Sequence, residues 1–217
     1  MATLANVQGP NDHVQARVLL NEAWKSVQGT YPSVNELNAA QTIASLETVY
    51  GRAGQFAALA NQGKYNWGAL QRQRNPDGSC PLGTAPGLDV LDANNPRSRC
   101  FYFYPSDFEA AKAFLRSLTV SFPIRARATL AAMKTGDLLK VAQAMKYSDP
   151  AHAYFELDAD AYGQRLLTRS RQIFSQISAA STPAYATSSN TNFAALTLGI
   201  VALGTGIWYF LTSQRGR

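Results

Sequence analysis

The sequence has few residues of the kinds that hold metal ions. It contains two histidines and two cysteines among 217 residues, and the cysteines, Cys80 and Cys100, come without a CxxC pair or a histidine partner. It also lacks a glycine-rich phosphate loop, an HExxH motif and an internal repeat. These absences exclude the common zinc and nucleotide motifs, and we expect neither a metal nor a cofactor.

Charge is sparse as well. Charged residues make up 16% of the chain, and no run of Lys or Arg stands out. The net charge of +6 and the sequence pI near 9.4 suit an anionic partner such as nucleic acid, a lipid surface or a wall polymer. Because the positive side chains are scattered through 112–171, they indicate a solvated surface, and no nucleic-acid partner is expected.

The section 72–99 has little apolar material to hold it together, since it is rich in Pro, Gly and Asn. A disulfide between Cys80 and Cys100 would close a loop of about twenty residues and stabilise the fold by roughly 3 kcal/mol on the chain-entropy model. We predict this disulfide, which requires an oxidising compartment at some stage. Two free buried thiols are the alternative.

One long uncharged run lies near the end of the chain. It extends from Phe193 to Leu211, with only Thr197 and Thr205 carrying polar side chains. A helix of this length spans roughly 28 Å, close to the hydrocarbon thickness of a bilayer. We predict a single transmembrane helix over 193–212, with the lipid bilayer as a partner. A buried core helix, the alternative, would ordinarily keep a polar face.

The predicted span divides the chain into parts. We expect a domain over 1–177, a flexible Ser/Thr/Ala-rich tether over 178–192 and a short basic tail over 213–217. The positive-inside rule then places the domain on the wall-facing side of the membrane. Residues 1–20 do not have the pattern of a signal peptide. A virion membrane or a bacterial cell envelope fits this arrangement, with virion or envelope proteins as further partners.

Apolar spacing predicts a mainly α-helical domain with a small β-containing or irregular flap. Ser33 with Glu36 and Ser106 with Glu109 have the spacing of a capping box. The stretch FYFYPS at 101–106 is short, aromatic and strand-like. Helices are expected over 12–28, 34–50, 53–62 as a short turn, DFEAAKAFLRSL from Asp107, 123–134, 137–146 and 158–178.

The predicted second helix carries a carboxylate among apolar residues. On a helical wheel, Glu47 shares an arc with Ile43, Leu46 and Tyr50, close to the C-terminal end of the helix. Partial burial and the negative end of the helix dipole both raise the pKa of a carboxyl group. A carboxylic acid that is still protonated near neutral pH is what a glycosidase needs to protonate the leaving oxygen.

The alternative to a catalytic role is that this glutamate forms a surface ion pair with Arg52 or Lys64. The neighbouring residues favour the catalytic interpretation. Gly51 allows a sharp turn or a close approach to another element, and the NWG turn at 66–68 offers an amide and a ring for binding sugar. Tyr154 and Tyr162, which precede and open the last predicted helix, could complete a cleft, although ordinary core packing is the alternative for each aromatic residue.

Four motifs follow one another in an order typical of one enzyme family. They read ETVYG at 47–51, NWGAL at 66–70, FYFYPSDFEAAKAFLRSL at 101–118 and YFELDADAY at 154–162. In this combination the chain resembles, over roughly 35–170, the bacterial and phage glucosaminidase-type peptidoglycan hydrolases of the lysozyme-like superfamily. The resemblance implies a lysozyme-like helical fold.

The resemblance also implies an enzyme that cleaves β-1,4 bonds in the glycan strands of peptidoglycan, for local penetration of the wall by a phage particle or an envelope machine. Glu47 would be the single catalytic acid at a helix end. The residues expected to bind the substrate are Tyr50, Asn66, Trp67, Tyr154 and Tyr162.

The chain departs from the family pattern in two respects. Thr48 follows the glutamate where the family commonly has Ser, and no second catalytic acid can be matched, because Asp77, Asp89 and Asp92 lie in no recognisable motif. Without a second acid, an acetamido group or hydroxyl of the substrate could take its role. A lytic transglycosylase, a muramidase and an inactive wall-binding membrane protein are therefore alternatives.

Overall fold

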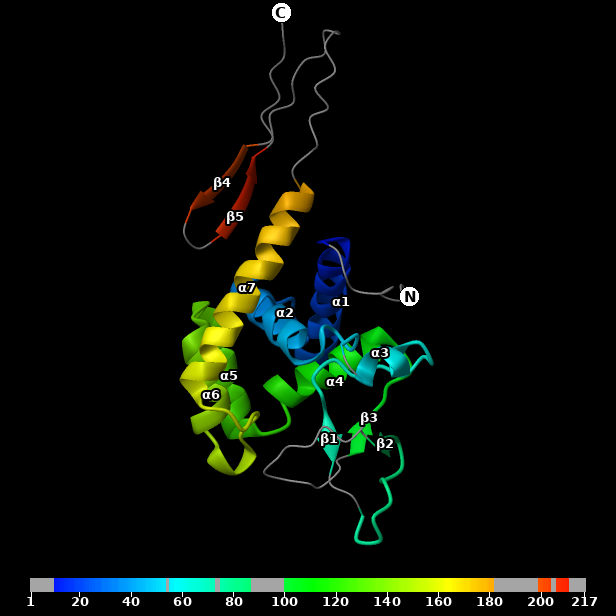
Figure 1. The fold of residues 1–217 in the computed structure, drawn as a ribbon. Coiled ribbons are helices and arrows are strands. Elements are labelled where there is room, and N and C mark those ends of the chain that lie inside the picture. The colour runs from blue at the N-terminus through cyan, green and yellow to red at the C-terminus, as the bar shows by residue number, and fades with distance from the viewer. Residues whose placement is uncertain are drawn as a thin grey trace, which may run out of the picture. The chain divides into compact units, whose positions relative to one another are not determined.

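The computed structural model describes residues 10–53, 55–72, 75–86, 100–181, 199–203 and 206–210. It divides into two compact units, Met1–Ser181 and Thr182–Arg217. Among the described residues of the first unit, the regular elements are helices and one small sheet, so the prediction of a mainly α fold is confirmed (Figure 1).

The helices of the first unit follow the predicted order closely. The second helix ends two residues before the expected boundary, and the last one extends three residues past it, into the predicted tether. The helices are α1 (Pro10–Gln28), α2 (Val34–Thr48), α3 (Gln55–Ala60), α4 (Asp107–Thr119), α5 (Pro123–Thr135), α6 (Leu138–Tyr147), the 3-10 helix η1 (Pro150–His152) and α7 (Ala159–Ser181).

Polar caps explain where the helices begin. The Ser33 hydroxyl accepts a hydrogen bond from the Glu36 amide, and the Glu36 carboxylate accepts one from the Ser33 amide, so the predicted capping box of α2 is present. At α4 the Ser106 hydroxyl caps the amide of Glu109. Asp137 caps α6 in the same way.

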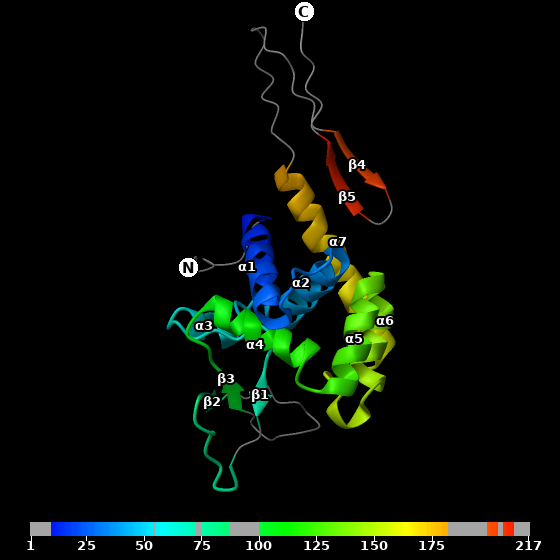
Figure 2. The same cartoon turned by 180° about the vertical axis from the view of Figure 1, so that it is seen from behind.

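The long helix α7 packs against α1, α2 and α6, while α4 packs against α1 and α5 (Figures 1 and 2). This arrangement encloses one apolar core. Its largest fully buried side chains include Leu20, Ile43, Phe114, Leu115, Leu118, Met133, Met145, Leu166 and Ile173. Because α2 ends within this packing, Glu47 is held close to the core rather than on an open surface.

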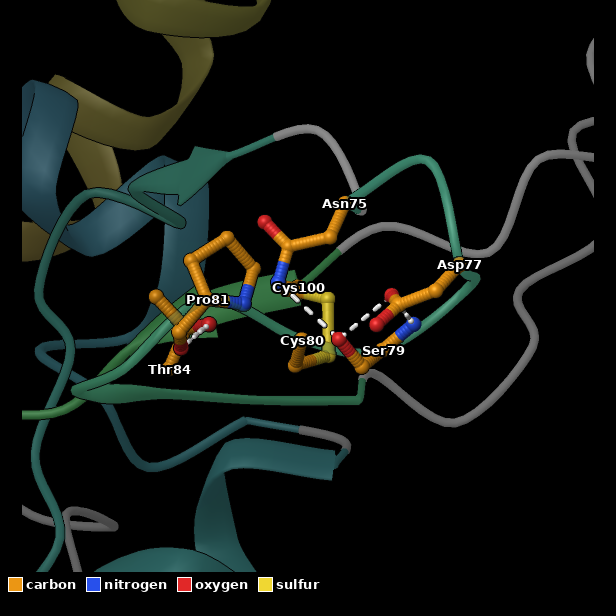
Figure 3. Close-up of a disulfide and its surroundings, with 7 residues drawn as sticks. All are labelled: Asn75, Asp77, Ser79, Cys80, Pro81, Thr84 and Cys100. Carbon is orange, nitrogen blue, oxygen red and sulfur yellow. Dashed lines mark hydrogen bonds between the residues drawn. A yellow bond between two sulfur atoms is a disulfide. The ribbon is translucent and has the colours of Figure 1, made fainter.

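The small sheet is antiparallel, with β3 (Cys100–Tyr102) between β1 (Gln71–Arg72) and β2 (Thr84–Pro86). The predicted disulfide is confirmed, since Cys80 is bonded to Cys100 with their Cα atoms 5.6 Å apart. Figure 3 shows this bond tying the loop before β2 to the first residue of β3.

The second unit contains an antiparallel pair of strands, β4 (Gly199–Leu203) and β5 (Gly206–Phe210), in which Leu203 pairs with Gly206. Here the structure differs from the predicted helix over 193–212. The described residues are rich in β-branched and aromatic side chains, which favour strands. None of the helices in the described part of the chain is long and apolar enough to cross a membrane. The rest of the predicted span, the tether beyond α7 and the basic tail lie outside the described residues.

Candidate active site

Glu47 is the next-to-last residue of α2, and its side chain is half-buried. Its Oε1 atom accepts a hydrogen bond of 2.5 Å from the hydroxyl of Tyr162 on α7. Burial raises the pKa of the Glu47 carboxyl group, because water no longer stabilises its charged form, and the hydrogen bond from Tyr162 partly opposes this shift. The group is therefore biased toward a protonated acid.

The two cations proposed as partners for this glutamate have other contacts. Arg52 forms an ion pair of 2.7 Å with Asp107 at the start of α4, and both side chains are buried. Lys64 donates to the side chain of Gln62. Neither cation is among the causes of the pKa shift of Glu47. The structure therefore does not support the interpretation of this residue as half of a surface ion pair.

The chain makes an unusual turn directly after α2. Val49, Tyr50 and Gly51 all have left-handed backbones, with φ angles of 47°, 56° and 76°. A β-branched residue is rarely found in this region. A Cβ atom at Gly51 would lie 3.0 Å from the carbonyl oxygen of Asn66, so glycine is required here by both backbone conformation and space. The expected close approach at this glycine is confirmed.

Thr48 joins this turn to the NWG turn. Its buried hydroxyl donates to the carbonyl oxygen of Trp67 over 2.8 Å and accepts from the amide of Gly51 over 2.7 Å. These two bonds lock the end of α2 against residues 66–68. Thr48 was singled out in the sequence only as a departure from the family pattern, and its hydroxyl explains why a Ser or Thr serves at this position.

The side chain of Asn66 forms hydrogen bonds with the backbone of its own turn and of a neighbouring segment. Its side-chain nitrogen donates to the carbonyl oxygens of Leu70 and Tyr102, and its side-chain oxygen accepts from the amides of Gly68 and Leu70. The residue is 1% exposed. Its amide therefore shapes the turn and connects it to β3, instead of facing a sugar as predicted.

Trp67 and Tyr50 also lie in the core, where each is 0% exposed and their ring centroids are 5.3 Å apart. The indole nitrogen of Trp67 donates to Asp107, and the Tyr50 hydroxyl contacts the Nδ1 atom of His13. Large apolar rings gain more from complete burial than from a partly wet cleft. Of the two interpretations of these rings, core packing is therefore the one that the structure supports.

Of the two late tyrosines, Tyr162 contacts Glu47 directly, and their predicted role in binding substrate stays a prediction. The hydroxyl of Tyr154 points to the carbonyl oxygen of Gly68 over 3.4 Å, and Tyr162 stacks on Phe155 with ring centroids 3.9 Å apart. Burial and the nearby charge of Glu47 hold the pKa of both phenols well above the usual value of 10.0. Both therefore stay protonated at neutral pH and can donate hydrogen bonds.

Arg125 is a neighbour of the site that the sequence did not reveal. It is buried on α5, where its guanidinium donates to the carbonyl oxygens of Ser117 and His152 and lies 5.4 Å from the ring centroid of Tyr154. No motif marks this arginine, because its role depends on contacts between α5 and residues far along the chain. The sequence did not mark Asp107 either, because acidic residues are common in the first turn of a helix and this position alone indicates no partner.

No second carboxylate is among the causes of the pKa shift of Glu47. Asp77 is exposed on the disulfide loop, where it accepts hydrogen bonds from Ser79 (Figure 3). The other two candidates, Asp89 and Asp92, lie outside the described residues. Within the described part of the chain, no group of three acidic, histidine or cysteine side chains could hold a metal ion.

Comparison with known proteins does not extend this picture. No protein-family model matches the chain, and neither a curated protein nor a solved structure does. The functional argument therefore depends on the residues and the geometry around Glu47.

Proposed function

We propose that the protein is a peptidoglycan hydrolase of the N-acetylglucosaminidase type, in which Glu47 protonates the leaving oxygen of a β-1,4 glycosidic bond. The observation that carries the proposal is the environment of this carboxyl group. It is half-buried at a helix end, its pKa is raised by burial, and its hydrogen-bond partner is a neutral phenol instead of a cation. General acids of glycosidases have environments of this kind.

In this mechanism Tyr162 has two tasks. Before proton transfer, its hydroxyl holds one carboxyl oxygen of Glu47 and so orients the other toward the substrate. After proton transfer, the same hydrogen bond stabilises the carboxylate that has formed. Tyr154, whose protonated hydroxyl donates to the carbonyl oxygen of Gly68, would be a further donor for the substrate. The carboxylate of Glu47 can then accept a proton from the attacking nucleophile.

A lytic transglycosylase or a muramidase on the same framework is the second candidate. The pKa shift of Glu47 has burial and the Tyr162 hydrogen bond as its causes and no neighbouring carboxylate, which favours a reaction in which the substrate supplies the nucleophile. An attack by a hydroxyl of the sugar would release an anhydro product, whereas an attack by water would release a reducing end.

The substitution Glu47→Gln tests the proposal, because glutamine keeps the shape of the side chain and removes the proton. We expect clearing of peptidoglycan in a zymogram to be lost, with an unchanged circular dichroism spectrum. Asp77→Asn is the matched control, since it neutralises an exposed acid on the disulfide loop whose hydrogen bonds come from Ser79. Mass spectrometry of the released fragments then separates glucosaminidase, muramidase and transglycosylase products.

The opposite result is also informative. If Glu47→Gln clears peptidoglycan to the same extent as the wild type, the assignment of this residue as the general acid is wrong. If the wild type binds purified sacculi but releases no soluble fragments, the inactive wall-binding protein is the better description.

The proposal includes attachment to a membrane through 193–212. Its support is the uncharged run in the sequence; the strands β4 and β5 give no support to a helical form of the segment. Flotation of the full chain with lipid vesicles tests the attachment. Val201→Arg should weaken it, because a charged side chain is costly inside a bilayer.

A further inference from the structure

An open pocket of about 470 Å³ lies between the end of α2 and the middle of α7. Leu46 and Val49, which flank Glu47 in the sequence, line it from α2. On α7 the lining begins at Gln164, two residues after Tyr162. At about 1.5 Å per residue, the pocket starts within roughly one helical turn of the Glu47–Tyr162 contact. We call this site the α2–α7 pocket.

The charge of the α2–α7 pocket is positive. Arg165 and Arg169 both line it, and none of the described residues that line it is acidic. Arg165 is exposed, and it takes part in none of the ion pairs found within the described part of the chain. A cation without a carboxylate partner beside an apolar surface is suited to an anionic ligand.

Arg169 is held in place before any ligand arrives. Its Nε atom donates to the Ser45 hydroxyl over 2.8 Å, and its Nη1 atom donates to Gln172 over 3.3 Å. Both partners also line the pocket. A guanidinium that is already oriented loses less conformational freedom on binding a carboxylate than a free side chain does.

The remaining lining suits a peptide. Leu46 and Val49 offer aliphatic contacts, while Gln164 and Thr168 offer polar ones. Val49 is placed against the pocket by its left-handed backbone, a conformation that glycine would adopt with less strain. The presence of a β-branched side chain at this position is explained if the side chain contacts a ligand.

We propose that the α2–α7 pocket binds the acidic peptide branch of the glycan substrate, with carboxylates of the peptide on Arg165 and Arg169. This inference rests on the proposed function, because it takes peptidoglycan as the substrate. A bare glycan of neutral sugars would leave both guanidinium groups without an anion. A short peptide with small aliphatic side chains, amide groups and free carboxylates complements every kind of residue that lines the pocket.

The probe is the tetrapeptide alanyl-γ-glutamyl-lysyl-alanine, which carries free carboxylates. Its binding to the full chain is measured by isothermal titration calorimetry. We expect Arg165→Gln to weaken binding by about tenfold, the usual effect of one charge-assisted hydrogen bond. Arg171→Gln is the matched control, because Arg171 is also exposed on α7 but does not line the pocket. Amidation of the peptide carboxylates should weaken binding in the same way.

The inference is overturned if the peptide does not bind saturably, or if Arg165→Gln and Arg171→Gln weaken binding equally. Cleavage of glycan strands stripped of their peptides is measured in parallel. Cleavage of stripped strands without binding of the tetrapeptide contradicts the pocket assignment alone. Binding that depends on Arg165, without cleavage of any wall preparation, supports the pocket assignment and contradicts the proposed function.

Discussion

The turn around Glu47 and the disulfide loop around Asp77 are stabilised in different ways. In the first region, Thr48 and Trp67 are fully buried, and side-chain hydrogen bonds connect α2, the NWG turn and α4. In the second, Leu82 is fully exposed, and the loop depends on the Cys80–Cys100 bond and local turns. Burial therefore determines the geometry of the first region, and a covalent bond determines that of the second.

The same difference in burial shifts the pKa values of two carboxyl groups in opposite directions. Burial raises the pKa of Glu47, whereas hydrogen bonds from Ser79 lower the pKa of the exposed Asp77. Loss of water from the charged form keeps a carboxyl group protonated nearer to neutral pH, as a general acid requires. The comparison explains why, of these two acids, Glu47 is the better catalytic candidate.

The largest expected effect is on the buried region. Trp67→Ala should lower the free energy of unfolding by about 3–5 kcal/mol, because it leaves a cavity and removes the indole donor of Asp107. Urea denaturation followed by circular dichroism measures the loss. Leu82→Ala in the loop is the control and should stay within about 0.5 kcal/mol of the wild type. Equal effects of the two substitutions would remove the distinction between the regions.

The loop should respond most to the loss of its covalent bond. Replacing both Cys80 and Cys100 by Ala should lower the free energy of unfolding by about 3 kcal/mol, because the unfolded chain gains freedom. Denaturation of the wild type with and without a thiol reductant gives an independent measurement. An unchanged urea midpoint in both experiments would mean that the loop opens without affecting the helical core.

The smallest expected effect is the pH dependence of folding stability that comes from Glu47 and Asp77. A raised pKa of Glu47 in the folded state makes the protein lose stability as the pH rises from 4.5 through the folded pKa. Glu47→Gln should therefore gain stability relative to the wild type at neutral pH, and gain less at pH 4. Thermal unfolding at both pH values measures the difference.

Asp77→Asn should show the opposite sign. The contribution of Asp77 is present above pH 3.8 and is lost as the pH falls through its lowered folded pKa. The variant should be slightly less stable than the wild type at neutral pH, with a small effect because the group is exposed. Identical pH profiles for the two variants would show that burial does not separate these acids.

Much of the helical fold was predictable, since local signals specify it. The capping box at Ser33 and Glu36, and apolar spacing elsewhere, placed α2 and the later helices within a few residues. The contact of Glu47 with Tyr162, 115 residues along the chain, was not predicted, because the sequence indicated Tyr162 only as a residue that could complete a cleft. Local patterns do not report which face of α7 packs on α2.

The aromatic residues show most clearly what a sequence leaves open. A ring such as Trp67 can stack on a sugar or fill a core, and both roles favour the same residue type. Here the hydrogen bond to Asp107 and the contact with Tyr50 place it in the core. Arg165 and Arg169 lie on an amphipathic helix whose sequence does not mark a binding site. They form a candidate site because α7 packs beside Leu46 and Val49 of the α2 end.

Sequence by itself determined the order of the helices to within a few residues at their ends, the one possible disulfide pair and Glu47 as a candidate acid, because caps, apolar periods and the pairing of two cysteines are local or forced. Tertiary structure decided which tyrosines face that acid and which aromatic rings serve the core. The physical reason is that burial is a property of packed elements. The pKa of Glu47 therefore depends on where α7 lies against the end of α2.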